Sequence, residues 1–257
     1  MLVATALAVS AVGFFRVVWF ISIGYGYAIA AMAGLLAWLA GSGMSWLLAT
    51  QLVLLFAYGA RLGTHVLMRG GQAAYRRAAQ ASYGEINIGL GKRFMIWIAV
   101  SLLYVMMFSS AAFLARQPPA VPALAVAGLI LMTAGLALEA AADWQKSAAK
   151  KIAPERFCNR GLFAWVRCPA YLGEIIFWAG NWLAGAPSCI SWWHWLVSSV
   201  GLICILLIML GATKRLEISQ QRRYGQEPDF QRYTQSVPIL LPWFPIYSVQ
   251  GLRWTLG

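Results

Sequence analysis

Long apolar runs separated by short polar stretches dominate the pattern of hydrophobic and polar positions along the chain. An α-helix needs about 20 apolar residues to cross a hydrocarbon core of ~30 Å. We expect seven such spans, near residues 2–20, 24–41, 44–68, 93–115, 121–145, 169–185 and 191–213. The pattern therefore predicts an all-α, polytopic membrane protein with about seven transmembrane helices.

Composition and charge agree with this class. The 257 residues are 61% hydrophobic and only 11% charged, more apolar than a soluble domain of this size needs to be. The net charge is +12, but Lys and Arg are interleaved with apolar runs and form no single basic face, so we expect no nucleic-acid partner.

The basic residues also predict the topology. With seven spans, all of the 20 Lys and Arg residues except Arg116 fall on one side of the membrane. The positive-inside rule then places the N-terminus outside and the C-terminus in the cytosol. No basic segment precedes the first apolar run, so we interpret it as a retained span and not as a removed signal peptide.

The cysteines and histidines give no sign of a disulfide or metal site. Cys158, Cys168, Cys189 and Cys204 lack the spacing of a zinc or redox site and the density of a disulfide scaffold. Only His65 and His194 could supply imidazole ligands. We expect neither a structural disulfide nor a bound metal.

The stretch 160–178 carries the strongest local features, because a basic and aromatic approach runs there into an apolar helix. Pro169 suits the first turn of a helix, where its missing amide has no intrahelical partner. The helix is therefore predicted to begin near Cys168. Spacings of three and four place Tyr171, Glu174, Trp178 and Asn181 on one face. A carboxylate in a membrane segment is unfavourable in lipid, which makes Glu174 a candidate functional residue.

Residues 1–57 contain no acidic residue and are interpreted as scaffold spans. Their small residues permit close helix contact, at Gly24, Gly26, Gly34, Gly41 and Gly43.

In the third span, Gln51 and Tyr58 lie seven residues apart and so share one side of the helix, which Arg61 and His65 continue. Tyr58 is equally well explained as a packing tyrosine or as a catalytic one.

Two cytosolic features follow. Residues 69–92, with Tyr75-Arg76-Arg77, are predicted to form a polar loop, with a contact to anionic lipid as the alternative to a functional role. The fifth span ends in a stripe of Glu139, Asp143, Lys146 and Lys150 at helical spacing. This stripe either meets a polar partner or forms surface ion pairs along the helix.

The tail from Lys214 onwards alternates Arg and Tyr, as in Arg222-Arg223-Tyr224 and Arg232-Tyr233. Such a segment suits a planar ligand that carries phosphate, since Arg binds phosphate in a bidentate manner and Tyr stacks. The chain lacks the glycine-rich dinucleotide fingerprint and the Walker loop. A nucleotide must therefore bind in another way.

Three separated stretches share their order and spacing with a known family. They are Glu139-x-x-x-Asp143-x-Gln145-Lys146-x-x-x-Lys150, Gly161-Leu162-Phe163 through Arg167-x-Pro169-x-Tyr171-x-Gly173-Glu174, and Arg223-Tyr224-Gly225 through Tyr233 and Pro242. Together they resemble the steroid 5-alpha-reductase family, which includes bacterial membrane members and is related to the sterol C14 reductases. The resemblance covers about residues 55–246.

The resemblance implies an oxidoreductase that acts on CH-CH donors and holds NADPH in a cavity open to the cytosol. The expected reaction is reduction of an activated C=C bond of a steroid-like or other lipid-soluble substrate. Tyr58 matches the tyrosine that donates to the substrate carbonyl, and the expected substrate-binding residues are Gln51, Arg61 and Asn181.

The cofactor-binding residues are also implied by position. Lys146, Lys150 and Arg156 match basic residues near the phosphates, and Tyr171 and Glu174 match residues at the nicotinamide end. The remaining implied contacts to the nucleotide are Arg69, Glu139, Asp143, Arg167, Arg223, Tyr224 and Tyr233.

Two other functions stay open. An isoprenylcysteine-type methyltransferase, which uses S-adenosylmethionine, is similar in its Arg-x-Pro-x-Tyr-x-Gly turn and its tail. A non-catalytic membrane protein that retains the nucleotide pocket is the other alternative. In each case we expect one membrane domain over 1–257, with scaffold spans in 1–57 and the ligand-binding region in 58–246. The expected location is a bacterial inner membrane, or the endoplasmic reticulum of a eukaryote. The sequence does not define the oligomeric state.

Overall fold

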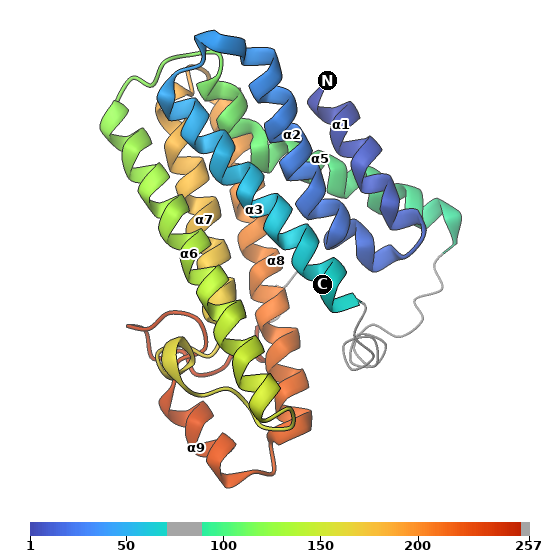
Figure 1. Cartoon of the computed structure of the whole chain (residues 1–257), viewed down its shortest axis with the longest axis vertical. Coiled ribbons are helices and arrows are strands. Elements are labelled where there is room, and N and C mark those ends of the chain that lie inside the picture. Colours follow the sequence, from blue (N-terminus) through green and yellow to red (C-terminus); the bar gives the residue numbers. More distant parts are fainter. Residues whose placement is uncertain (71–88, 253–257) are drawn as a thin grey trace. The chain divides into compact units, whose positions relative to one another are not determined.

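The computed structural model describes residues 1–70 and 89–252, which fold into helices and contain no β-strand (Figure 1). The predicted all-α class is confirmed. The α-helices are α1 (Leu2–Ser10), α2 (Ile23–Ala40), α3 (Trp46–Gly70), α5 (Leu90–Leu114), α6 (Pro122–Ile152), α7 (Pro169–Gly185), α8 (Trp192–Tyr224) and α9 (Pro228–Ser236). Short 3-10 helices join them at η1 (Ala11–Phe14), η2 (Val17–Ile21), η3 (Gly41–Gly43), η4 (Gly161–Ala164) and η5 (Ala186–Ser188). Most of the predicted polar loop, including Tyr75-Arg76-Arg77, lies outside the described residues.

Five segments are long and apolar enough to cross a membrane, which makes the chain an integral membrane protein. They are Val17–Gly43, Trp46–Met68, Leu90–Leu114, Pro122–Ile152 and Trp192–Tyr224. Helix α7 begins at Pro169, as the sequence predicts, but has 17 residues, or about 25 Å at 1.5 Å per residue. It is therefore shorter than the five spanning segments.

The sequence predicts one continuous span over residues 2–20, and this prediction is wrong. Helix α1 ends at Ser10, and the backbone is extended at Arg16 (φ −147°, ψ 124°) before the segment that leads into α2. Gly13 explains the turn, because a Cβ at this position would lie 2.1 Å from the Phe20 ring. The Arg16 guanidinium lies 5.3 Å from the centre of the Trp19 ring, which stabilises the new direction of the chain.

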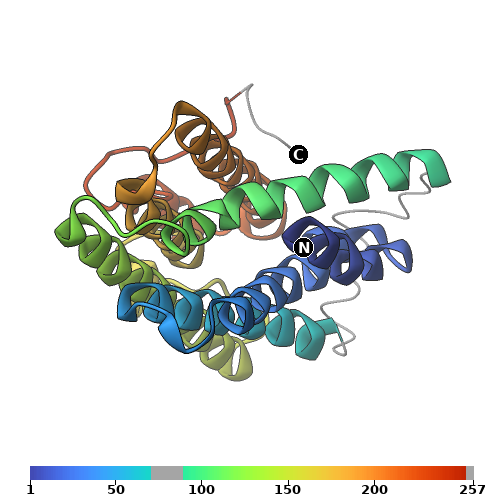
Figure 2. The same ribbon diagram turned by 90° about the horizontal axis from the view of Figure 1, so that it is seen from above.

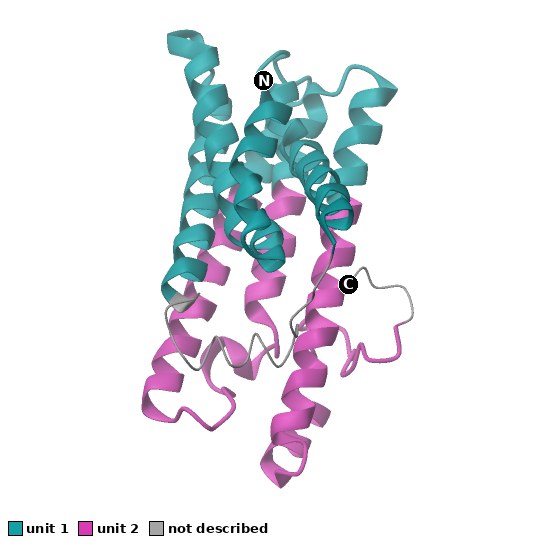
Figure 3. Ribbon diagram, turned by 90° about the vertical axis from the view of Figure 1, so that its right-hand side faces the viewer, with its two compact units in different colours: residues 1–129, 181–202 teal, residues 130–180, 203–257 magenta. Residues whose placement is uncertain are grey.

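Contacts divide the chain into two compact units (Figure 3). Unit 1 contains residues 1–129 and 181–202, and unit 2 contains residues 130–180 and 203–257. Helices α6, α7 and α8 each contribute residues to both units. The two units are described separately below.

In unit 1, α2 packs against both α1 and α3, and α1 also packs against α5 (Figures 1 and 2). Glycines set the distance between α2 and α3. A Cβ added to Gly59 would lie 2.3 Å from the Gly26 carbonyl oxygen, and one added to Gly26 would lie 2.7 Å from the Gly63 nitrogen. The backbones therefore touch, as close helix pairs in membranes do through small residues.

In unit 2, glycines allow the same close backbone contact between α6 and α7. A Cβ on Gly135 would lie 2.5 Å from the Gly173 carbonyl oxygen, and one on Gly173 would lie 2.8 Å from the Glu139 nitrogen. The crossing brings the backbone of Glu139 beside that of Gly173, next to Glu174. Both carboxylate residues are buried, at 4% and 7% exposure.

The predicted close helix contact is observed at Gly26, whose added Cβ would lie 2.7 Å from the backbone of α3, and at Gly24, whose added Cβ would lie 3.2 Å from Ser10 Cα at the end of α1. It is not observed for Gly34, Gly41 and Gly43, where an added Cβ would meet no other described part of the chain within 4 Å. Gly41 instead ends α2 with a positive φ of 61°, a conformation that glycine adopts without strain.

We predict that Gly59→Ala destabilises the protein by about 1–3 kcal/mol, because the added methyl forces apart a backbone contact. The matched control is Gly34→Ala on the exposed face of α2, where alanine should be neutral or stabilise the helix by up to ~1 kcal/mol. Chemical unfolding in detergent micelles measures both variants. Equal midpoints for the two would mean that the crossing tolerates a side chain.

Candidate binding pocket

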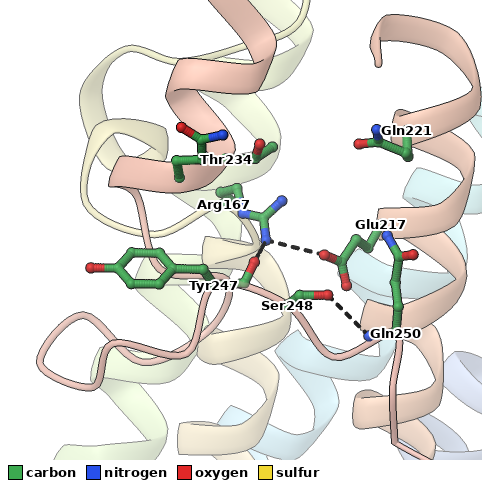
Figure 4. A pocket seen from close by; sticks show the side chains of 8 residues that line it. Arg167, Glu217, Gln221, Thr234, Tyr247, Ser248 and Gln250 are labelled. Atoms are coloured by element: carbon green, nitrogen blue, oxygen red, sulfur yellow. Dashed lines mark hydrogen bonds and ion pairs between the residues drawn. The ribbon is translucent and has the colours of Figure 1, made fainter. Parts of the chain in front are cut away.

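A polar pocket of about 470 Å³ lies in unit 2 (Figure 4). This volume falls in the range of small-molecule sites. The lining side chains come from the approach to α7, from α8 and α9, and from residues 237–252, which we call the C-terminal strap. They are Arg167, Glu217, Gln221, Thr234, Gln235, Tyr247, Ser248 and Gln250.

A buried ion pair forms one wall of the pocket. The Arg167 guanidinium lies 3.3 Å from Glu217, and the two side chains are 2% and 6% exposed. The same guanidinium donates to the Tyr247 carbonyl oxygen, while the Val249 amide donates to the second Glu217 oxygen at 2.9 Å. One carboxylate and one guanidinium thus hold the strap at two points.

Backbone hydrogen bonds extend this attachment. The Arg167 and Cys168 amides donate to the Pro238 and Ile239 carbonyl oxygens, each at 3.0 Å. The strap residues Ile239, Leu240 and Val249 also form an apolar cluster with Cys168. Burial raises the pKa of the Cys168 thiol to about 12, so this cysteine packs as a neutral apolar group.

The Arg167 side chain retains capacity to donate. Its Nε is buried and has no hydrogen-bond partner among the described residues. Figure 4 shows its second terminal nitrogen directed away from Glu217, on the side of Thr234 and Gln221. With three glutamines and three hydroxyl-bearing residues also lining the pocket, the site is rich in hydrogen-bond donors.

A basic–aromatic cluster forms where the end of α6 meets the end of α8. Lys150 Nζ donates to the Pro154 oxygen (2.9 Å), the Arg156 oxygen (2.6 Å) and the Tyr224 hydroxyl (2.9 Å). These bonds use all three donors of the ammonium group. Lys150 therefore fixes the turn after α6 against α8.

The aromatic side chains of this cluster surround Phe157, which contacts Tyr224, Phe230 and Tyr233 at ring-centre distances of 5.1–5.8 Å. The Tyr233 hydroxyl donates to the Phe163 oxygen at 2.7 Å, and burial raises the pKa of this phenol, so it stays protonated. The basic–aromatic cluster thus joins α9 to the chain before α7.

Arg223 adds a cation at the rim of this cluster. Its guanidinium lies 5.3 Å from the Tyr224 ring centre and 2.5 Å from the Glu155 carboxylate. A hydrogen bond from Arg223 lowers the pKa of Glu155. Both side chains are at least half exposed, so solvent screens this pair and it can exchange for another anion.

Unit 1 holds the residues that the sequence assigns to the substrate. Tyr58 is fully buried, and its hydroxyl lies 2.8 Å from that of Tyr25, which stacks on Tyr104. Gln51 Nε2 donates to the Asn181 side-chain oxygen at 2.9 Å, and Asn181 Nδ2 donates to the Met107 oxygen at 3.0 Å. Two predicted residues that are 130 positions apart therefore meet.

The predicted site residues fall into both units. Unit 1 contains Tyr58, Gln51, Arg61 and Asn181. Unit 2 contains Glu139, Asp143, Lys146, Lys150, Arg156, Arg167, Tyr171, Glu174, Arg223, Tyr224 and Tyr233. Glu139, Asp143, Lys146 and Lys150 lie on α6, and Tyr171, Glu174, Trp178 and Asn181 lie on α7, as predicted. The side chain of Arg69 lies outside the described residues.

Sequence reasoning missed Tyr25, Phe157 and Glu217. A sequence feature could have indicated Glu217, because it is an isolated carboxylate among the basic residues that follow the last apolar run. No local pattern distinguishes Tyr25 or Phe157 from packing residues. Their roles depend on contacts between distant parts of the chain.

The fold and pocket define an all-helical integral membrane protein with a polar, arginine-containing site. The chain belongs to the family described as "Protein of unknown function (DUF1295)", which matches residues 11–237 and is steroid 5-alpha-reductase-like. No curated protein and no solved structure matches the chain. The strap from residue 238 onwards lies beyond the matched range.

We predict that Glu217→Ala destabilises the protein by about 3–5 kcal/mol, because it leaves the Arg167 guanidinium buried without its carboxylate. The control is Glu155→Ala, which removes a carboxylate from an exposed arginine pair and should change stability little. Chemical unfolding in micelles compares the two variants. A Glu217 variant as stable as the Glu155 variant would show that the pair does not hold the strap.

Proposed function

We propose that this chain is an NADPH-dependent membrane oxidoreductase that reduces an activated C=C bond, such as an enone, in a steroid-like or other lipid-soluble substrate. The observation that carries the proposal is that unit 2 contains both the basic–aromatic cluster and a donor-rich pocket, with α8 and α9 contributing residues to each. Membership of a steroid 5-alpha-reductase-like family supports it.

The donor set of unit 2 fits a dinucleotide that carries phosphate. The buried Nε of Arg167 offers a hydrogen bond that no described residue accepts. Arg156 and Arg223 present exposed guanidinium groups, which bind phosphate oxygens in a bidentate manner. Tyr224 and Tyr233 supply aromatic surface beside these cations.

Each predicted cofactor-binding residue is assigned to one part of the nucleotide. Arg156, Arg167 and Arg223 bind the phosphates, with Lys146 and Lys150 adding positive charge. Because its donors are already used, Lys150 acts through its charge and by fixing the turn that carries Arg156. At the nicotinamide end the proposal assigns Tyr171 and Glu174. The further contacts to the nucleotide are Arg69, Glu139, Asp143, Tyr224 and Tyr233.

NADPH would supply the hydride, and Tyr58 would supply the proton. A phenol stays protonated at neutral pH and can donate to the oxygen of a developing enolate, which a dry site stabilises most. Tyr58 has full burial, and Tyr25 holds its hydroxyl at 2.8 Å. Gln51, Arg61 and Asn181 would orient the substrate.

We also propose that α7 and the N-terminal segment Leu2–Phe14 are embedded in the membrane, which gives seven membrane segments in all. The distribution of Lys and Arg then places the N-terminus outside and the C-terminus in the cytosol. Reporter domains fused to each end test this topology. Reporters on the same side of the membrane would contradict it.

The proposed function is tested by titrating the purified protein in detergent, in parallel, with NADPH and with S-adenosylmethionine. We expect saturable binding of NADPH with a dissociation constant of about 1 μM to 1 mM, and no binding of S-adenosylmethionine. Binding of S-adenosylmethionine alone would indicate a methyltransferase. Binding of neither would indicate a non-catalytic protein.

We predict that Tyr58→Phe lowers the turnover of an enone by about 10²–10⁴-fold, because the proton donor is lost, and leaves NADPH affinity unchanged. The matched control is Tyr27→Phe, which removes a phenol from the neighbouring helix α2 that pairs with Thr64 at 3.3 Å. Turnover by the control should stay near that of the parent protein. Normal turnover by the Tyr58 variant would identify this residue as packing.

A further inference from the structure

An exposed apolar surface lies in the C-terminal strap, in residues 241–247, which we call the aromatic loop. Its sequence is Leu241-Pro242-Trp243-Phe244-Pro245-Ile246-Tyr247. Trp243 is 86% exposed, Phe244 58% and Ile246 46%. Large apolar side chains exposed together mark an interaction surface, because their exposure to water is unfavourable.

Hydrogen bonds hold this loop in one shape. The Ile239 amide donates to the Ile246 oxygen at 2.9 Å, and the Phe244 amide donates to the Leu241 oxygen at 3.2 Å, which closes a tight turn. Pro242 and Pro245 restrict the backbone further. The exposed side chains therefore project from an ordered turn, and the surface exists before any partner binds.

Hydrogen bonds from the strap to α8 and to the residues before α7 fix the position of the loop along these helices. On α8, Lys214 Nζ donates to the Leu252 oxygen at 2.7 Å, and Glu217 accepts from the Val249 amide at 2.9 Å. Lys214 is the first charged residue after the apolar run of α8. On the other side, the strap binds Arg167 and Cys168, directly before α7 begins. Both attachments lie where an apolar helix meets polar sequence.

Helix α8 carries no aromatic residue close to Lys214. Its first turn carries the exposed side chains Trp192, Trp193 and Trp195, as expected at a membrane interface. From Leu196 to Arg223 it contains no Trp, Tyr or Phe. Lys214 follows Trp192 by about 33 Å at 1.5 Å per residue, close to the ~30 Å thickness of a hydrocarbon core. The strap brings aromatic side chains to this second interface.

We propose that the aromatic loop inserts into the boundary between headgroups and acyl chains of the leaflet where α7 begins, and so anchors the strap to the bilayer. Trp and Tyr prefer this layer, where their apolar rings and their polar N–H or O–H groups are both satisfied, and Phe buries its apolar ring there. Tyr247 ends the loop and also lines the pocket, so the anchor steadies one pocket wall. The proposal does not depend on the proposed function.

The test uses the full chain in lipid vesicles with an environment-sensitive NBD label at position 243, introduced as Trp243→Cys. The matched control is Ser236→Cys on the exposed surface of α9. Cys158, Cys189 and Cys204 are replaced by serine in both, and buried Cys168 is retained. The protein with the three serine replacements but without a new cysteine measures residual labelling. Gel filtration verifies that both labelled variants are folded.

We expect the label at position 243 to emit at shorter wavelength than the label at 236. Lipids brominated high on the acyl chain should quench the first label, and aqueous iodide should quench the second. Equal quenching of both labels by iodide would overturn the proposal. A label at 243 that neither quencher reaches would also overturn it, because a protein surface would then cover the loop.

Discussion

The buried ion pair between Arg167 and Glu217 is the interaction on which the arrangement of unit 2 depends. Removing two charges from water is costly, so such a pair persists only where each charge has further partners. Here Tyr247 and Val249 provide them, and both belong to the strap. The pair therefore links the segment before α7, helix α8 and the strap, and it also forms one wall of the pocket.

Glycine provides the second constraint, because it lets helix backbones touch. At Gly26 and Gly59 the contact brings α2 against α3, the two helices that carry the hydrogen-bonded tyrosines Tyr25 and Tyr58. At Gly135 and Gly173 it brings α6 against α7 beside two buried carboxylate residues. In both units, the polar residues that we assign to the site lie next to a helix–helix contact that leaves no room for a Cβ.

The sequence predicts the features that local chemistry controls. Pro169 marks the start of α7, because proline belongs in a first helical turn, and helical spacing places Glu139 and Lys150 on α6. The turn after Ser10 was missed, because an apolar run gives no sign of a bend that depends on Phe20 packing against Gly13. Tyr25 was missed because its partner Tyr58 is 33 residues away and no local pattern encodes such a pair. Glu217 stands out as an isolated carboxylate, but its partner Arg167 is 50 residues away and the pairing could not be predicted.

Hydrogen exchange with mass spectrometry tests most directly whether unit 2 binds NADPH, as proposed, and where in unit 2 it binds. The protein in micelles is compared with and without saturating NADPH. We predict that NADPH slows amide exchange in 150–163, which contains the turn after α6, and in 221–252, which contains α9 and the strap. Protection confined to unit 1, or no protection at saturation, would contradict the account.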